Sequence, residues 1–189
     1  VVAAVAVAVV YSGFVFVVAA AGLVVDFDAR PPRFVLLLLF VGMAAVAFAA
    51  SRVGAALATL PLWLLVGFHV FRLPLELVMD RAAAEGVMPV VMGFRGRNFD
   101  VVAGASAPIV ALLLWRGAPR ALAVVWLIVS SITLVNVVVV ALLASPVFRF
   151  FGDDQLNTWV ATAPFVWLPT ILVAAALAGH VVVARALAR

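Results

Sequence analysis

The stretch GFRGRNFD, residues 93–100, gathers two arginines, an asparagine and an aspartate in a chain that is 69% hydrophobic. Before it, Arg72, Glu76 and Asp80 follow one another at intervals of four residues, which places them on one face of a helix. Charged groups within a membrane usually pair with one another and face the interior of the protein. The segment 72–100 is therefore the candidate site for binding or for a buried ion network.

Two interpretations of Arg95 and Arg97 stay open. They extend to the lipid headgroups as ordinary interfacial arginines, or they join Arg72, Glu76 and Asp100 in one buried ion network that closes the outer mouth of a helix bundle. In the second case, an arginine without an acidic partner would bind an anionic small molecule or a lipid headgroup.

Glycines in the same stretch predict a tight turn, because Gly93 and Gly96 allow backbone conformations that other residues rarely adopt. After the turn, Asn98 or Asp100 is expected to cap the next helix, since a short polar side chain accepts the free amides there. The turn also folds the charges back on one another. We therefore expect Arg95 or Arg97 within ion-pair reach of an acidic side chain, the candidates being Glu76, Asp80 and Asp100.

The composition places the whole chain in lipid. Charged residues make up 11% of it, against about 25% in soluble domains, and a chain of this size could not hide so much apolar surface from water. The basic residues are scattered over the loops without forming a stripe, which argues against a nucleic-acid partner. The predicted class is an all-α, polytopic transmembrane helix bundle, and its predicted partner is the surrounding lipid bilayer.

Six stretches approach the roughly 20 apolar residues that a helix needs to cross the bilayer. Long apolar runs without period-two alternation exclude a β-barrel. We expect one transmembrane domain over residues 1–189, with spans at about 1–25, 34–51, 53–71, 100–115, 121–147 and 159–184. Between the third and fourth spans, Pro74 and Gly86 delimit a short helix that is kinked off the third span or lies in the interface.

The loops divide into two sets by charge. Those after the second and fourth spans, with the C-terminal tail, carry five arginines and no acidic residue. The remaining loops, at about 26–33, 72–100 and 149–157, carry seven arginines and all eight acidic residues. Because short cytoplasmic loops are enriched in arginine, we expect both termini on the cytoplasmic side of the inner membrane and residues 93–100 on the outer side.

Polar residues inside the predicted spans have mostly structural explanations. Ser130 and Thr133 are expected to bond within or between helices, whereas Asn136 is costlier in lipid and should face the bundle. His69 and His180 are predicted near opposite faces of the membrane, roughly 30 Å apart in depth at 1.5 Å per residue. They therefore should not share a haem iron, and neither a cofactor nor a metal site is predicted.

Four segments carry a resemblance to a known group of proteins. FRLPLEL, EGVMP, GFRGRNFDVVAGASAP and PFVWLPTILV resemble blocks in a family of small, uncharacterised bacterial integral membrane proteins, over about residues 68–185. The resemblance implies a prokaryotic membrane protein in which the segment 72–100 is important. It implies no activity and no catalytic residue.

Three classes of function are compatible with these features. The favoured one is a transporter-type or ligand-binding bundle with an extracytoplasmic charged site at 72–100. The alternative is a structural or accessory subunit, as a homo-oligomer or within a larger membrane complex. A membrane enzyme acting on lipid is least favoured, because no clustered base or metal-ligand set is visible.

Overall fold

The computed structural model describes residues 2–27, 29 and 32–189, with the side chains of the first helix described from Val9 onward. These residues are helical and include no strand. Val1 of the first predicted span lies outside this part, as do Asp28, Arg30 and Pro31 of the first predicted loop. The helices are α1 Val2–Ala20, α2 Arg33–Ala50, α3 Arg52–Leu57, α4 Leu62–Gly67, α5 Arg72–Ala84, α6 Val101–Trp115, α7 Arg120–Leu143 and α8 Ala174–Leu187. The 3-10 turns are η1 Phe68–Phe71, η2 Val90–Met92, η3 Asp153–Gln155 and η4 Trp159–Ala161, and η5 Leu168–Val173 is a π-helix.

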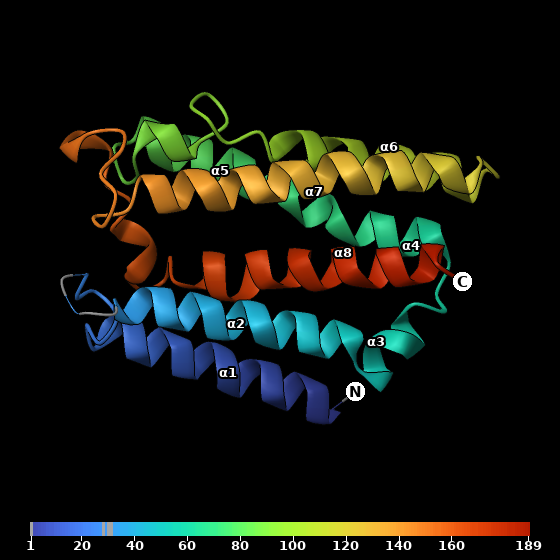
Figure 1. The fold of residues 1–189 in the computed structure, drawn as a ribbon, viewed down its shortest axis with the longest axis horizontal. Coiled ribbons are helices and arrows are strands. Elements are labelled where there is room, and N and C mark those ends of the chain that lie inside the picture. The colour runs from blue at the N-terminus through green and yellow to red at the C-terminus, as the bar shows by residue number, and fades with distance from the viewer. Residues whose placement is uncertain (1, 28, 30–31) are drawn as a thin grey trace.

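The long helices run alongside one another in a bundle (Figure 1). Helix α8 lies in its middle, where it packs against α2 on one side and against α4 and α7 on the other. Helix α6 packs against α4, α5 and α7. Helix α1 is joined to η5 by a hydrogen bond from Tyr11 Oη to Thr170 O at 3.2 Å, and to the residue before η5 by one from Trp167 Nε1 to Ser12 O at 3.0 Å.

Both chain ends lie at one end of the bundle, together with α3 and the turn between α6 and α7 (Figure 1). The segments that follow α1, α5 and α7 lie at the opposite end. The predicted division of the loops into two sets therefore matches the direction in which the helices run.

Four helical segments are long and apolar enough to cross a membrane: Arg33–Ala50, Leu62–Ala84, Arg120–Leu143 and Leu168–Leu187. The described apolar part of α1, Val9–Ala20, and helix α6 are shorter than a full span. The chain is therefore an all-helical protein with at least four segments suited to lipid.

The second of these segments, Leu62–Ala84, differs from the prediction. The expected span at 53–71 corresponds to α3, a turn and only the first half of Leu62–Ala84. The backbone passes from η1 into α5 in helical conformation at Phe71 and Arg72, so no separate interfacial helix begins there. Pro74 has no backbone N–H and cannot donate the helical hydrogen bond to the carbonyl of the preceding turn. The 3-10 turn η1 occupies that preceding turn. The end of α5 is as predicted, since Gly86 adopts a positive φ of 72°.

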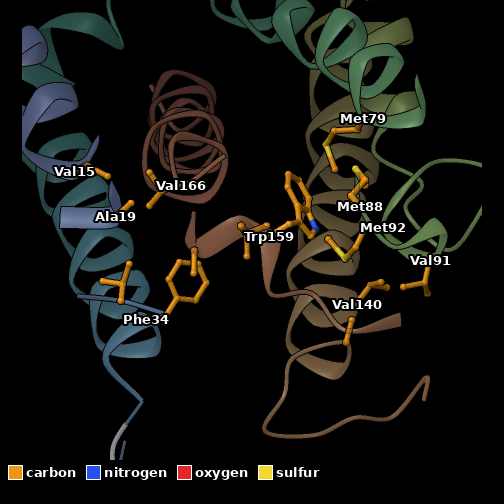
Figure 2. Close-up of a cluster of buried hydrophobic side chains, with 14 residues drawn as sticks. Val15, Ala19, Phe34, Met79, Met88, Val91, Met92, Val140, Trp159 and Val166 are labelled. Carbon is orange, nitrogen blue, oxygen red and sulfur yellow. The ribbon is translucent and has the colours of Figure 1, made fainter. Parts of the chain in front are cut away.

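The last predicted span, 159–184, also begins later than expected. Residues 159–167 form η4 and turns, and the helix starts with the π-helical turn η5, which contains Pro169. Trp159 lies in the middle of the buried apolar cluster at this end of the bundle, between Phe34 and Val166 on one side and Met79 and Met92 on the other (Figure 2).

Candidate functional site

A close approach of two helices builds the polar centre of the bundle. At Gly104 of α6 a Cβ atom would lie 2.4 Å from the backbone nitrogen of Leu73 in α5, so only glycine allows this contact. One turn before Gly104, at the start of α6, Asp100 faces Arg72. Arg72 Nε donates to Asp100 Oδ2 at 2.7 Å, and Arg72 Nη2 donates to Asp100 Oδ1. The pair is bidentate, and Arg72 is 1% exposed.

Helices α7 and α8 complete the surroundings of Arg72. Its Nη1 donates to Ser130 Oγ at 2.6 Å, and Ser130 Oγ lies 2.8 Å from His180 Nε2. His180 Nδ1 lies 2.6 Å from Ala176 O and must carry the proton there, because a carbonyl oxygen only accepts. In the neutral ring, Nε2 is then the acceptor for the Ser130 hydroxyl. The chain of hydrogen bonds therefore runs in one direction from Arg72 to α8.

Asn98 connects this pair to a second buried acid. Its Nδ2 lies 3.0 and 2.9 Å from the two carboxylate oxygens of Glu76, and 3.1 Å from Met92 O. Its Oδ1 accepts the backbone N–H of Asp100 at 2.9 Å. This bond fixes the residue before α6 and does not cap the helix. The Asp100 side chain stands at the N-cap but makes no capping bond, because it pairs with Arg72, so the expected side-chain cap is not formed. Glu76 is 2% exposed and has no ion-pair partner among the described residues.

Arg95 and Arg97 lie outside the buried centre. Arg95 Nε lies 3.3 Å from Asp80 Oδ2, which confirms the expected ion-pair reach, but its side chain is 72% exposed. The guanidinium carbon of Arg97 lies 5.4 Å from the centre of the Phe151 ring. Of the two interpretations left open for Arg95 and Arg97, the structure therefore favours exposed arginines over membership of the buried network. The turn at 93–97 closes on itself, with Gly96 N bonded to Gly93 O, and the Arg95 and Arg97 side chains in it are exposed.

Asn136, in α7, binds the segment between α5 and α6. Its Oδ1 accepts the backbone N–H of Phe99 at 3.2 Å. The asparagine thus satisfies an amide that precedes α6 and ties the segment after α5 to the bundle. The polar cost of an asparagine within a span is offset by this bond.

His69 and His180 are close together, and the prediction that they lie at opposite depths is wrong. Their ring centres are 4.7 Å apart, and both pack against Trp126. The error came from ending the third span at Phe71, which placed His69 near a membrane face. His69 is fully buried, and neither ring nitrogen has a hydrogen-bond partner among the described residues. These residues include no group of three or more potential metal ligands.

A pocket of about 260 Å³ lies beside the polar centre. Its walls come from α2, α5, α7, η5 and the start of α8, and they are mainly apolar. Glu76 and Asp100 are its charged lining residues among those described. Two further lining residues from α7, Val138 and Leu142, are exposed on the outer surface of the bundle. The pocket therefore opens toward the surface of the bundle on the α7 side.

Sequence reasoning missed four residues of this region: Ser130 as a partner of Arg72, His180, Asn157 and Trp159. Asn157 and Trp159 line the pocket, and each has a buried side-chain atom, Asn157 Oδ1 and Trp159 Nε1, without a hydrogen-bond partner in the described part of the chain. The polar run around Ser130 was a usable signal for a partner inside the bundle. No local pattern marked Asn157 or Trp159, because their role depends on where the segment after α7 folds back.

The helices and the buried pair define the class as a polytopic helical membrane protein with a polar centre. Comparison of the chain with protein families, with curated proteins and with solved structures finds no match.

Proposed function

We propose that this protein is an inner-membrane ligand-binding or transport bundle that takes up an amphiphilic molecule from the lipid phase. The ligand's apolar part occupies the pocket between α2 and α7, and its polar end meets Glu76. The observation that carries the proposal is the presence of the buried carboxylate of Glu76 in the lining of a mainly apolar pocket. Small-molecule sites typically combine apolar walls with a few polar groups in this way.

We further propose that the chain crosses the membrane six times and that both termini lie on the cytoplasmic side. Helix α1, with 19 residues, is about 29 Å long at 1.5 Å per residue, close to the hydrocarbon thickness of about 30 Å. Helix α6, with 15 residues, reaches only about 22 Å and runs beside α7. Arginine-only loops at the end that holds both termini support the cytoplasmic assignment.

The acidic lining of the pocket disfavours the anionic ligand that was expected from the sequence. The guanidinium of Arg72 is engaged by Asp100 and Ser130, and the charged lining residues among those described are acidic. An anion at this end of the pocket would meet like charge in a low-dielectric setting. We therefore place a neutral or cationic polar end there.

Two glycines offer a matched test of the pocket. A Cβ atom at Gly42 or at Gly13 would have no neighbour within 4 Å, so both positions accept a larger side chain without a clash at Cβ. Gly42 lines the pocket, and Gly13 does not. We expect Gly42→Leu to fill the pocket and to lower the affinity for an octyl-chain ligand at least tenfold, while Gly13→Leu binds like the wild type.

The measurement is saturable binding of octylamine, 1-octanol or octanoate to the protein in nanodiscs, followed by native mass spectrometry. Partition of the same compounds into empty nanodiscs gives the non-specific background. If none of the three compounds binds saturably, or if Gly42→Leu binds as the wild type does, the proposal is refuted. That outcome would favour an accessory subunit of a larger complex.

A further inference from the structure

Resting on the proposed function, we infer that the pocket selects a lipophilic ammonium ion, with Glu76 as its counterion. The ligand class is a primary or secondary amine that carries an alkyl or aryl body. Such a molecule places N–H donors and a positive charge against the carboxylate while its body stays among apolar side chains.

The hydrogen bonds of Glu76 are the first support. An ionised carboxylate offers about four acceptor positions. Both oxygens of Glu76 receive only Asn98 Nδ2, which also bonds to Met92 O. One amide hydrogen of Asn98 is therefore shared between the two carboxylate oxygens of Glu76, because the other bonds to Met92 O. Among the described residues, most of the acceptor positions of Glu76, which is 2% exposed, have no donor. Buried charged groups are costly unless they are paired and fully hydrogen-bonded.

The charge of the neighbourhood is the second support. Arg72 lies one turn before Glu76, but it is engaged bidentately by Asp100. The two charges of that pair cancel, so the formal charge of Glu76 has no counterion among the described residues. His180, on the far side of Arg72, is bound to Ser130 and Ala176 and makes no contact with Glu76. A cation that enters the pocket would therefore meet a carboxylate that has no ion-pair partner among the described residues.

Other lining groups suit the same ligand. Asn157 Oδ1 is a buried acceptor without a partner, while the Nδ2 of this side chain donates to Ala141 O at 3.4 Å. Phe27, Phe34 and Trp159 contribute aromatic rings to the lining. Aromatic faces attract organic cations within about 6 Å, by about 0.5–2 kcal/mol each. The free Trp159 Nε1 can only donate, so it does not compete for the ammonium group.

The experiment compares ligands that share one chain length. Octylammonium, 1-octanol, octanoate and octyltrimethylammonium are titrated at pH 7 against the wild type, Glu76→Gln and Glu85→Gln in nanodiscs. Primary amines are charged at this pH. Glu85 is an exposed acid just after α5 and serves as the matched control. We expect octylammonium to bind the wild type at least tenfold more tightly than the neutral and anionic ligands, and more tightly than the quaternary ion, which lacks N–H donors.

In Glu76→Gln the preference for ammonium over octanol should disappear while octanol still binds, and Glu85→Gln should behave as the wild type. Equal binding of octanol and octylammonium to the wild type, or a preference retained in Glu76→Gln, overturns the inference and leaves the proposed pocket intact. Absence of saturable binding for every ligand refutes the proposed function itself. The comparison of ligands on the wild type decides the matter even if Glu76→Gln does not fold.

Discussion

Replacing Arg72 with methionine removes the positive charge of the buried pair while keeping a long apolar side chain in its place. Asp100 then loses its bidentate partner, and Ser130 loses a donor at 2.6 Å. Two acids, Asp100 and Glu76, remain buried without a counterion. The variant is therefore expected to lose much of the free energy of unfolding.

The magnitude follows from the geometry of the pair. At about 4 Å between charge centres and an effective dielectric constant of about 20, the attraction is about 4 kcal/mol. Removing one partner of a buried pair costs about 3–5 kcal/mol, because the other charge is left unpaired. Arg95→Met gives the matched control. Its pair with Asp80 lies at 3.3 Å, but the arginine is largely exposed, so the change should cost at most about 1 kcal/mol.

Reversible unfolding in mixed micelles, followed by far-UV circular dichroism, measures both values. A double variant, Arg72→Met with Asp100→Leu, replaces both charges by apolar groups and should be more stable than Arg72→Met alone. The reasoning is refuted if Arg72→Met unfolds within 1 kcal/mol of the wild type, or if the double variant is less stable than Arg72→Met.

Three further predictions concern the surroundings of the pair. Gly104→Ala forces α5 and α6 apart at Leu73 and should lower the free energy of unfolding by about 1–3 kcal/mol, as denaturation will show. His69→Leu should leave stability unchanged or raised, because neither ring nitrogen has a hydrogen-bond partner among the described residues. His180→Leu should lower it by about 1–3 kcal/mol, because the proton of the buried Ser130 hydroxyl loses its acceptor. A single cysteine at Asp154, in a chain without native cysteine, should react with an impermeant thiol reagent added outside intact cells; labelling only after lysis would reverse the assigned orientation.

Much of the helical class could be predicted from composition and hydrophobic runs alone. The segment Arg120–Leu143 was located within a few residues, because its apolar run is long and uninterrupted. The predicted third span, 53–71, was misplaced for a physical reason. Arg72 and Glu76 suggested an exit from the membrane, since isolated charges are costly there. Their partners, Asp100 and Asn98, lie in a segment more than twenty residues away in the chain, and no local pattern reveals such pairing.

The candidate site was predictable only in part for the same reason. Arg72, Glu76 and Asp100 were grouped in one of the two interpretations, because their polarity contrasts with the rest of the chain, and Asn98 was expected as a helix cap and not as the partner of Glu76. The four arginines of 72–100 could not be ranked by sequence. Arg72 differs from Arg95 in being on a helix that packs against Gly104, and glycine permits an approach that buries the guanidinium. Burial is a property of the assembled bundle, which spacing along one helix does not determine.

The buried pair also explains how an acidic group can remain beside an apolar pocket. Asn98 donates to Glu76 and accepts from the backbone of Asp100, so Arg72 fixes the position of Glu76 through two intermediates. Arg72 in turn is held by α7 through Ser130. The carboxylate of Glu76 is thus held by Asn98 and has no ion-pair partner among the described residues. An oriented carboxylate without an ion-pair partner in the lining of a mainly apolar pocket is the arrangement that a cationic ligand requires.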